Sequence, residues 1–577
     1  MVGVVASGDA TGYRLHPHPL RHITNAVVRT SAANGRARLR AAAALPTKYD
    51  LRNVDGESYL SPMRNQGSHG TCWTFSAMAG LEWIMRKEEG IDANLSENNL
   101  ANMHGFCAGY DDGGNNEMAM AVILREEAPV AEALDPYPNP GASVRERGVR
   151  TPRKVVFVPM RTSVSNATQL QADLEAFKRA IMEYGPLATS YADNSKYKNG
   201  AAYYCNETIV CNHAVSIIGW DDSYSATNFR ETPPGDGAFI IRNSWGTGWY
   251  ENGYMYISYY DRTLGFGDVQ VAYASLSKGD DYGQVYQHDF HGYVNRIGYG
   301  SETACAANVF VARNNETLSA FGFYALAKNT SYSAFIVTDP DLSGDDIAGD
   351  WMPVKEGICY DAGYEVIPFD APVAVSNAST FAIVVKLTVP NESSPIPVCC
   401  NDHFSDGTPY VTNVEAVAGL SLVCADPERY YWEDISACGR YFCCKVYAAP
   451  RGGASCTTST DTPVPYGWLD SYAALQATDY FLRYYLCCYN ALAEHVAANG
   501  LSIAASFEKG LDPDSAATET NLTATISFDA FGAPVIGVTP KNTSLWSYTV
   551  LGSEDLRDWH SPTNSADRFF KVSVQPK

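Results

Sequence analysis

The sequence has no apolar run that approaches the roughly 18 residues needed to span a bilayer. It also lacks an excess of basic residues, since 64 acidic side chains outnumber 42 basic ones and the formal net charge is −22. A chain this acidic is repelled by phosphate backbones and by anionic lipid, so we expect neither nucleic acid nor a membrane surface as a partner. At 577 residues the chain is long enough for about three folded units.

The cysteine spacing of zinc knuckles is missing as well. Several of the 15 cysteines are adjacent instead, as in Cys399-Cys400, Cys443-Cys444 and Cys487-Cys488. We therefore predict no structural metal and no cofactor. If one cysteine is a catalytic thiol, the remaining even number can pair as disulfides, and Cys205 and Cys211 are close enough in sequence for a local bridge.

Residues 65–73, which read Asn-Gln-Gly-Ser-His-Gly-Thr-Cys-Trp, carry the strongest chemical signal. Apolar residues recur at helical spacing from Cys72, Thr71 is a candidate N-cap, and Gly90 can end the helix. A thiol in the first turn faces unpaired N–H groups and the positive end of the helix dipole, which favour the thiolate. The Gln66 amide lies upstream as a donor for an oxyanion. A lone cysteine in a helix is more often structural, but its flanking residues favour a nucleophile.

A nucleophilic thiol needs a base, and His213 is the best candidate. An apolar run follows it, and a second run over residues 237–242 ends at Asn243. Joined by the polar segment 221–236, the two runs predict a hairpin. A hairpin symmetric about residue 228 places His213 opposite Asn243, although a bulge would shift this register. The Asn243 amide could then hold one ring nitrogen and turn the other towards the thiol.

These residues resemble the signature of the papain family of cysteine peptidases. The resemblance implies that Gln66 and the backbone N–H of Cys72 stabilise the oxyanion, that His213 is the base and that Asn243 orients it. It also implies that Trp245 shields the His213 and Asn243 pair from water. The expected fold is α+β: a two-lobed peptidase with a helical lobe and a β-barrel lobe.

The same resemblance suggests where a substrate binds. Gly113 and Gly114 fall where the family has a glycine pair whose backbone pairs with bound peptide, although an Asp-Gly turn is the plainer interpretation. Ala214 falls where the family lines its main side-chain pocket. His69 stands where many relatives have a second cysteine, so the disulfide that staples this loop is absent.

The first 45 residues are rich in arginine and alanine, and Asp9 is their only acidic side chain. They lack an apolar core typical of a secretory signal, so no signal peptide is visible. Papain-like enzymes are usually made with an inhibitory leader. Residues 1–45 are therefore interpreted as a leader or short propeptide that the enzyme removes near Ala44 or Leu45, with an unstructured tail as the alternative.

After residue 275 the sequence changes to short alternating strands between turn signals, as over residues 318–325, 333–337 and 381–387, which predicts a β-sandwich or jelly roll. Residues 298–319 resemble the lectin-like domain that follows the peptidase in some secreted bacterial and archaeal relatives. No sugar-binding constellation stands out. The expected organisation is a leader (1–45), a papain-like peptidase (46–275), a lectin-like domain (276–450), a linker (451–465) and a small α+β module (466–577).

The sequence thus predicts a secreted or cell-surface zymogen of a cysteine endopeptidase that acts on proteins or peptides through Cys72 and His213. The β domain is a candidate to bind carbohydrate or another cell-surface ligand. The alternative is a non-catalytic adhesin or glycan-binding protein that retains a retired peptidase domain. An acyltransferase with the same Cys and His pair is a third option that the sequence leaves open.

Overall fold

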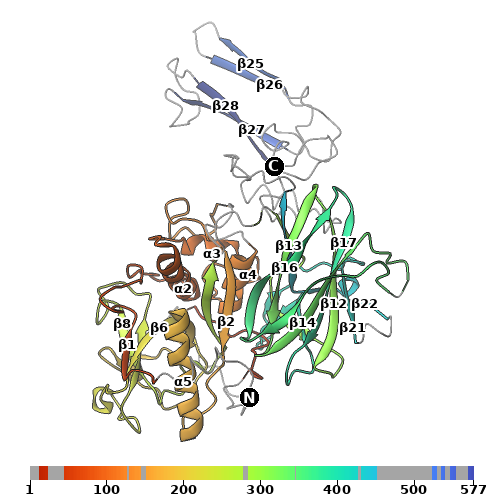
Figure 1. Cartoon of the computed structure of the whole chain (residues 1–577). Coiled ribbons are helices and arrows are strands. Elements are labelled where there is room, and N and C mark those ends of the chain that lie inside the picture. The colour runs from red at the N-terminus through yellow and green to blue at the C-terminus, as the bar shows by residue number, and fades with distance from the viewer. Residues whose placement is uncertain are drawn as a thin grey trace. The chain divides into compact units, whose positions relative to one another are not determined.

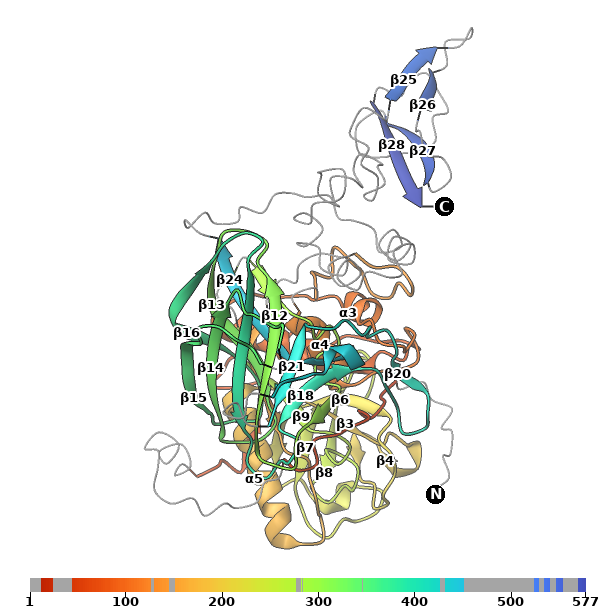
Figure 2. The same cartoon turned by 90° about the vertical axis from the view of Figure 1, so that its right-hand side faces the viewer.

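The computed structural model describes residues 12–23, 44–125, 129–144, 151–276, 282, 284–344, 346–425 and 431–450, together with four strands between residues 523 and 576. The chain divides into two compact units. The first contains residues 1–143 and 148–457, and the second contains residues 144–147 and 458–577. Figures 1 and 2 show the elements of both units in chain order by colour.

Among the described residues of the first unit, the α-helices lie before residue 190, and only short 3-10 helices follow (Figure 1). They are α2 (Cys72–Glu89), α3 (Glu97–Met103), α4 (Asn116–Leu124) and α5 (Ala167–Tyr184), with the 3-10 helices η1 (Ser195–Tyr197), η2 (Ala226–Asn228) and η4 (Ser436–Cys438).

Helix α2 begins at Cys72 and ends before Gly90, which takes the left-handed conformation at a φ of 69°. The sequence prediction for this helix is confirmed, because glycine adopts that conformation without a Cβ clash. Thr71 occupies the N-cap position, as predicted, but its side chain makes no capping hydrogen bond. The Thr71 hydroxyl instead lies 2.6 Å from the hydroxyl of Tyr137, so the start of α2 is tied to a neighbouring loop.

The strands of the peptidase half form one end of a 13-stranded sheet. Their order is β2-β9-β3-β6-β7-β8-β5-β4, with β1 paired to β6. They are β1 (Lys48–Asp50), β2 (Pro152–Val158), β3 (Leu187–Tyr191), β4 (Lys198–Asn199), β5 (Ala202–Tyr203), β6 (His213–Asp221), β7 (Ala238–Arg242), β8 (Tyr254–Ser258) and β9 (Gln270–Leu276).

Strands β6 and β7 form the predicted antiparallel hairpin, but with a different register. Ser216 lies opposite Arg242, and a bulge between Ile217 and Gly219 shifts the pairing further along. Near the catalytic end the register is therefore displaced by two residues from the symmetric prediction. An even displacement keeps every side chain on the same face. The side chains of His213 and Asn243 still meet, because β7 ends at Arg242 and the next residue leaves the sheet.

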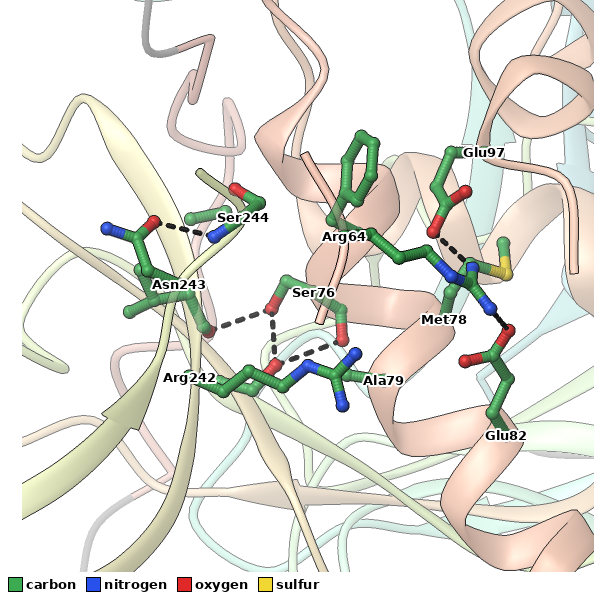
Figure 3. Close-up of a pocket in the computed structure, with 13 residues that line it drawn as sticks. Arg64, Ser76, Met78, Ala79, Glu82, Glu97, Arg242, Asn243 and Ser244 are labelled. Atoms are coloured by element: carbon green, nitrogen blue, oxygen red, sulfur yellow. Dashed lines mark hydrogen bonds and ion pairs between the residues drawn. The ribbon is translucent and has the colours of Figure 1, made fainter. Parts of the chain in front are cut away.

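Helix α2 packs against β6 through small polar side chains as well as apolar ones. The Ser76 hydroxyl donates to the carbonyl oxygen of Val215 at 2.8 Å, and the Ser216 hydroxyl donates to the carbonyl oxygen of Ser76 at 3.3 Å (Figure 3). Buried hydroxyls need such partners. These bonds fix the start of the helix against the strand that carries His213.

The second half of the first unit is a β-sandwich, as the sequence predicts. One sheet has the order β15-β14-β17-β12-β21-β22, and the other is β10-β24-β13-β16 with a separate β11-β18-β23 sheet beside them. The strands are β10 (Gln284–Tyr286), β11 (Asn295–Ile297), β12 (Thr303–Val311), β13 (Glu316–Ala325), β14 (Thr330–Thr338), β15 (Met352–Cys359), β16 (Gly363–Val375), β17 (Thr380–Thr388), β18 (Ile396–Cys400), β19 (Asp402–His403), β20 (Pro409–Val411), β21 (Ser421–Cys424), β22 (Glu433–Asp434), β23 (Arg440–Phe442) and β24 (Cys444–Pro450).

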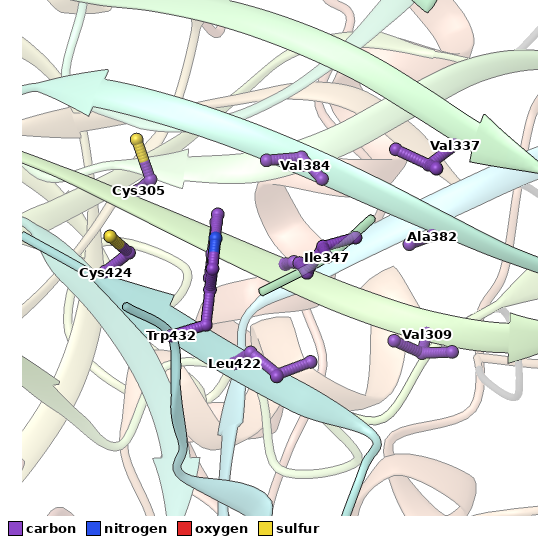
Figure 4. Packing of buried hydrophobic residues seen from close by; sticks show 10 residues of the cluster. Cys305, Val309, Val337, Ile347, Ala382, Val384, Leu422, Cys424 and Trp432 are labelled. Carbon is purple, nitrogen blue, oxygen red and sulfur yellow. The ribbon is translucent and has the colours of Figure 1, made fainter. Parts of the chain in front are cut away.

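Side chains from β12, β17 and β21 build a buried apolar cluster on the six-stranded sheet. Trp432 packs among these aliphatic side chains (Figure 4). Its other buried members are Cys305, Ala307, Val309, Val337, Ile347, Ala382, Val384, Leu422 and Cys424. Alternation of inward apolar and outward polar residues along these strands is what the sequence pattern predicted.

The two halves of the first unit share one sheet, because β16 of the sandwich pairs with β2 of the peptidase half. Gly363 lies at this junction, where an added Cβ would come 2.0 Å from the carbonyl oxygen of Val155. Its φ of 136° is also one that other residues rarely adopt. A glycine is therefore required where the two halves join. The sequence pattern did not predict this continuous sheet.

The second unit contains two strand pairs among its described residues. Strand β25 (Thr523–Phe528) pairs with β26 (Pro534–Thr539), and β27 (Trp546–Ser553) pairs with β28 (Phe569–Pro576). These strands fall within the module predicted over residues 466–577. The predicted linker (451–465) lies outside the described residues. Among the helices that are described, none combines the length and the apolar character required to cross a membrane.

Candidate active site

Cys72 is the first residue of α2, and its side chain is fully buried. The backbone N–H of Ala214 donates to Cys72 Sγ at 3.2 Å. Ala214 directly follows His213 in β6, so the thiol lies against the strand residue that carries the imidazole. Burial raises the pKa of Cys72 to about 12, and hydrogen bonds from the backbone of Ala214, Trp73 and Cys72 itself act in the opposite direction.

The His213 imidazole is held on two sides. Its Nε2 lies 2.8 Å from Asn243 Oδ1. An amide oxygen only accepts, so this contact assigns a proton to Nε2. The Trp245 ring stacks on the imidazole with 4.7 Å between ring centres and 17° between planes. The orientation of the ring is therefore set by an amide at one edge and an indole on one face.

Lys198 also contacts the Trp245 ring. Its Nζ is 4.8 Å from the centre of the Trp245 ring, and it also pairs with Asp193 at 2.7 Å. A cation over an indole face is attracted by the ring quadrupole. This contact stabilises the position of Trp245 and hence of His213.

Gln66 reaches the same site from the loop that precedes α2. Its backbone N–H donates to the carbonyl oxygen of Ser244 at 2.8 Å, and its Oε1 accepts from the Ser244 hydroxyl at 2.5 Å. Its Nε2 donates to the carbonyl oxygen of His69 at 2.8 Å. Ser244 was not among the predicted site residues, although its position next to Asn243 was the available signal.

A buried ion-pair cluster holds the loop that carries Gln66 against helices α2 and α3. The Arg64 guanidinium binds Glu82 of α2 and Glu97 of α3 (Figure 3). Figure 3 shows the cluster on one side of a pocket and Asn243 and Ser244 on the other. Breaking a buried pair leaves an uncompensated charge, which is strongly destabilising. Arg64 therefore couples the loop that carries Gln66 to both helices.

Gly114 pairs with a peptide backbone, and that backbone is the chain's own N-terminal segment (residues 12–23), which Gly113 also approaches closely. The Gly114 N–H donates to the Gly12 carbonyl oxygen at 3.0 Å, and the Arg14 N–H donates to the Gly114 carbonyl oxygen at 2.9 Å. Tyr13 and Gly114 form a parallel bridge. An added Cβ on Gly113 would lie 2.6 Å from the Gly12 carbonyl oxygen, so this approach requires a glycine.

The N-terminal segment also contacts both sides of the thiol. Gly12, at a φ of 87°, lies so close to Gly70 that an added Cβ would come 2.1 Å from its carbonyl oxygen. The Tyr13 N–H donates to the carbonyl oxygen of Asn212 at 2.9 Å. Gly70 lies two residues before Cys72, and Asn212 directly precedes His213. The segment therefore lies across the Cys72 and His213 site.

The β-sandwich holds the same segment from its other side. The Arg14 guanidinium lies 3.6 Å from the centre of the Phe404 ring and donates to Thr408 Oγ1 at 2.6 Å and to Asp406 Oδ2 at 3.1 Å. Further along, His18 Nε2 lies 2.8 Å from Asp402 Oδ2. Strands β19 and β20 carry or flank these partners, so both halves of the first unit contact the N-terminal segment.

Two further predictions concern disulfides, one in the loop of His69 and one between Cys205 and Cys211. His69 Nδ1 lies within hydrogen-bond distance of Asp111 Oδ1, at 2.9 Å, so a side-chain contact links the loops that a disulfide joins in many papain relatives. The local bridge expected between Cys205 and Cys211 is not formed. The Cys205 thiol donates to the carbonyl oxygen of Glu207 and the Cys211 thiol to that of Thr263, both at 3.3 Å.

Comparisons with known proteins agree with this architecture. Residues 45–276 match the model of the papain family cysteine protease, and residues 285–448 match that of the lectin like domain. Cathepsin J of Mus musculus is 27% identical over 216 residues, which are 36% of this chain and 60% of that protein. The probable cysteine protease RD19B of Arabidopsis thaliana is 28% identical over 228 residues, 37% of this chain and 58% of that protein. The chain thus spans about 60% of the length of these relatives.

Two solved structures of Cwp84 match over both halves of the first unit. The clostridial cysteine protease Cwp84 after propeptide cleavage has a TM-score of 0.59 and 27% identity, covering 68% of this chain and 97% of that one. The cysteine protease and lectin-like domains of Cwp84, a surface layer associated protein of Clostridium difficile, give a TM-score of 0.58 and 25% identity, with coverage of 71% and 90%. The chain therefore contains a papain family cysteine protease domain followed by a lectin-like domain.

Proposed function

We propose that this protein is a cysteine endopeptidase that hydrolyses peptide bonds through an acyl-enzyme on Cys72. Asn243 holds the proton on His213 Nε2, so Nδ1 is the ring nitrogen that takes the proton of the thiol. The thiolate attacks the peptide carbonyl, and the imidazolium protonates the leaving amine. Water then attacks the thioester with His213 as base, which releases the acid and restores the thiol.

Two donors serve the oxyanion in this proposal. One is the backbone N–H of Cys72 at the start of α2, and the other is Gln66 Nε2. The amide NH₂ of Gln66 has two hydrogens, so it can keep its bond to the His69 carbonyl oxygen and donate the second hydrogen to the oxyanion. Removing one such donor costs about 3 to 4 kcal/mol of transition-state stabilisation in comparable sites.

A single geometric observation supports the proposal most strongly. The sulfur of Cys72 accepts the N–H of Ala214 at 3.2 Å, while the adjacent residue, His213, is held by Asn243 at 2.8 Å. A nucleophile, a base and an orienting group from three separate segments thus meet at one place. Chance packing rarely combines all three with a glutamine amide.

We further propose that residues 1–45 act as an inhibitory leader. The backbone of the N-terminal segment occupies the hydrogen-bonding edge of Gly114 that a substrate strand would need. The parent chain should lose this leader near Ala44 or Leu45 on incubation, whereas the Cys72→Ala variant should keep it. Identical trimming in both would contradict self-processing.

The remaining domain roles are also proposals. The peptidase would extend over residues 46–275 and the lectin-like domain over 276–450, with residues 451–465 as a linker and 466–577 as an accessory module. The match of this chain to the protease and lectin-like domains of a surface layer associated protein supports a secreted or cell-surface location. A lectin-like domain supports carbohydrate or a cell-surface ligand as a partner.

The competing function is a non-catalytic adhesin or glycan-binding protein with a retired peptidase domain. The test is hydrolysis of an unstructured protein such as casein, after the leader has been cut in place by a trace of trypsin and the trypsin has been inhibited. We expect hydrolysis by the parent and none by Cys72→Ala. Cys107→Ser, which removes an exposed thiol, should behave as the parent. Equal turnover by the parent and Cys72→Ala, or none by either, would contradict the endopeptidase.

A further inference from the structure

The side chain of Tyr13 in the N-terminal segment is buried, and its tip lies against the carboxylate of Asp268; the space that this side chain fills is called the Tyr13 pocket. Its hydroxyl donates to Asp268 Oδ2 at 2.9 Å. Tyr13 is 5% exposed and Asp268 is 2% exposed, so this bond is formed away from solvent. Glu117 of α4, at 4% exposure, lies near enough to both to influence their ionisation. The pocket therefore takes an aromatic ring and presents acceptors to its tip.

The backbone around Tyr13 shows which substrate residue would use this pocket. Tyr13 lies opposite Gly114 in the parallel bridge, and its own N–H donates to the Asn212 carbonyl oxygen. An extended substrate that pairs with the same edge of Gly114 would place its paired residue where Tyr13 is now. The side chain of that residue would enter between Gly114 and Asn212, next to His213.

The carboxylate of Asp268 depends on the N-terminal segment for its hydrogen bonds. Within the described part of the chain, both bonds to it come from that segment, one from the Tyr13 hydroxyl and one from the His16 N–H at 3.2 Å. Asp268 Oδ1 has no partner there, and neither has either carboxyl oxygen of Glu117. Buried polar groups are normally satisfied. Departure of the leader would leave Asp268 without a protein donor at the end of this pocket.

We propose that this pocket selects substrates, and that it takes a long side chain that ends in a hydrogen-bond donor, with tyrosine preferred over phenylalanine. Arginine and lysine share the required chemistry. The inference rests on the proposed peptidase function and names the substrate class of that same site. Asp268 is its specificity-determining residue.

Tyrosine is preferred over phenylalanine because a buried carboxylate that accepts a hydrogen bond is lower in free energy than one without a donor. Burial raises the pKa of Asp268 to about 6, whereas the bonds from Tyr13 and His16 act to lower it, so a donor at the tip of the bound side chain favours the ionised carboxylate. A hydrogen bond to a charged group is worth more than a neutral one, and an apolar tip leaves the buried charge unpaired. We expect a discrimination of about 10- to 100-fold between tyrosine and phenylalanine.

The first test is a set of peptides that differ at one position at a time, hydrolysed by the chain with its leader cut in place. At the one position that pairs with Gly114, kcat/KM should be about 10- to 100-fold higher for tyrosine than for phenylalanine, and arginine should exceed leucine. Rates for tyrosine and phenylalanine within a factor of about two at every position would overturn the pocket. That outcome would leave the proposed function standing.

Two variants of Asp268 distinguish the effects of its hydrogen-bond acceptor and its charge from the effect of the size of the pocket. Asp268→Leu removes the acceptor, so the preference for tyrosine over phenylalanine should disappear while leucine and phenylalanine peptides are still cleaved. Asp268→Asn keeps an acceptor but removes the charge, so tyrosine should remain preferred and arginine should lose its advantage over leucine. A tyrosine preference that survives in Asp268→Leu would overturn the assignment.

A second test needs no catalysis and therefore distinguishes failure of the pocket from failure of the proposed function. In the uncut chain, Tyr13→Phe should loosen the N-terminal segment and raise the alkylation rate of Cys72 about 10-fold or more. In the Asp268→Leu background the same change should have little effect, because the two residues act as a pair. Additive effects would overturn the pocket. Coupling without hydrolysis of any peptide would support the pocket and contradict the peptidase.

Discussion

The backbone N–H of Tyr13 donates to the carbonyl oxygen of Asn212, the residue directly before His213, at 2.9 Å. A residue near one end of the chain thus lies beside the imidazole that the sequence marks as a base. Together with the Gly114 bonds, this contact places the N-terminal segment over Cys72. The accessibility of Cys72 therefore reports on whether this segment is in place.

Gly12→Ala should weaken the hold of the N-terminal segment. The added Cβ would come 2.1 Å from the Gly70 carbonyl oxygen, and alanine is strained at a φ of 87°. We expect the alkylation rate of Cys72 in the uncut chain to rise roughly 10- to 100-fold, measured by mass spectrometry against time. After the leader has been cut, parent and variant should react alike. An unchanged rate in the uncut chain would contradict the position of Gly12.

The contact between Arg14 and the lectin-like domain predicts a smaller effect. Phe404→Ala removes the ring beneath the guanidinium and should raise Cys72 alkylation about 2- to 5-fold. Asp406→Asn breaks a largely exposed ion pair and should have an effect of at most a few-fold that fades at high salt. The Phe404→Ala effect should persist at high salt. If neither variant changes the rate, the lectin-like domain does not help to retain the segment.

The pH dependence of Cys72 alkylation should differ between the uncut and cut chains. With the segment in place, burial raises the pKa of the thiol to about 12, so the reactive thiolate should increase about tenfold per pH unit from neutral pH upward. Release of the segment reduces the burial and should lower this pKa. The cut chain should then react faster at pH 7 with a flatter profile. Fast alkylation of the uncut chain that does not depend on pH would contradict this account.

Gln66→Ala tests the oxyanion donor. We expect kcat to fall roughly 10²- to 10³-fold with little change in KM, because the donor acts in the transition state. Ser244→Ala removes only the hydroxyl that holds Gln66 Oε1 and should lower kcat by about tenfold or less. The two variants are measured with the same peptide at saturation. A rise in KM alone for Gln66→Ala would assign that residue to binding.

The junction between the two halves predicts an effect on stability. Gly363→Ala places a Cβ 2.0 Å from the Val155 carbonyl oxygen at a strained φ and should lower the free energy of unfolding by about 1 to 3 kcal/mol or more. Gly344→Ala is the matched control, because nothing lies within 4 Å of an added Cβ there. It should change stability by less than about 0.5 kcal/mol. Equal denaturation midpoints for both would contradict the pairing of β2 with β16.

Local signals in the sequence were sufficient to predict the helix that begins at Cys72 and the contact between His213 and Asn243. Helical spacing and the glycine at position 90 predict the bounds of α2 without knowledge of tertiary contacts. The hairpin register was wrong by two residues at the catalytic end because the pairing of the two strands is not centred on residue 228, and the bulge between Ile217 and Gly219 shifts it by one more residue towards the turn. The predicted contact between His213 and Asn243 is still formed, because side chains in a strand alternate with a period of two and a shift by two residues keeps them on the same face.

The pairings between distant segments could not be predicted. The bridge between Tyr13 and Gly114 and the junction at Gly363 join residues far apart in the chain, and no periodic pattern encodes such partners. Asp268 was overlooked for the same reason, since a lone aspartate after a glycine reads as a turn. Glu117 did carry a signal, because it is a carboxylate in the otherwise apolar helix α4.

The cooperation of Cys72 with His213 is tested most directly by covalent labelling. The chain with its leader cut in place is incubated with an epoxide that alkylates activated thiols, and the adducts are mapped by mass spectrometry. We expect one rapid adduct on Cys72 at pH 6 to 7 and its loss in His213→Ala, while Cys107→Ser labels as the parent does. An adduct on Cys72 that forms equally fast without His213, or no adduct on Cys72 at all, would contradict the account.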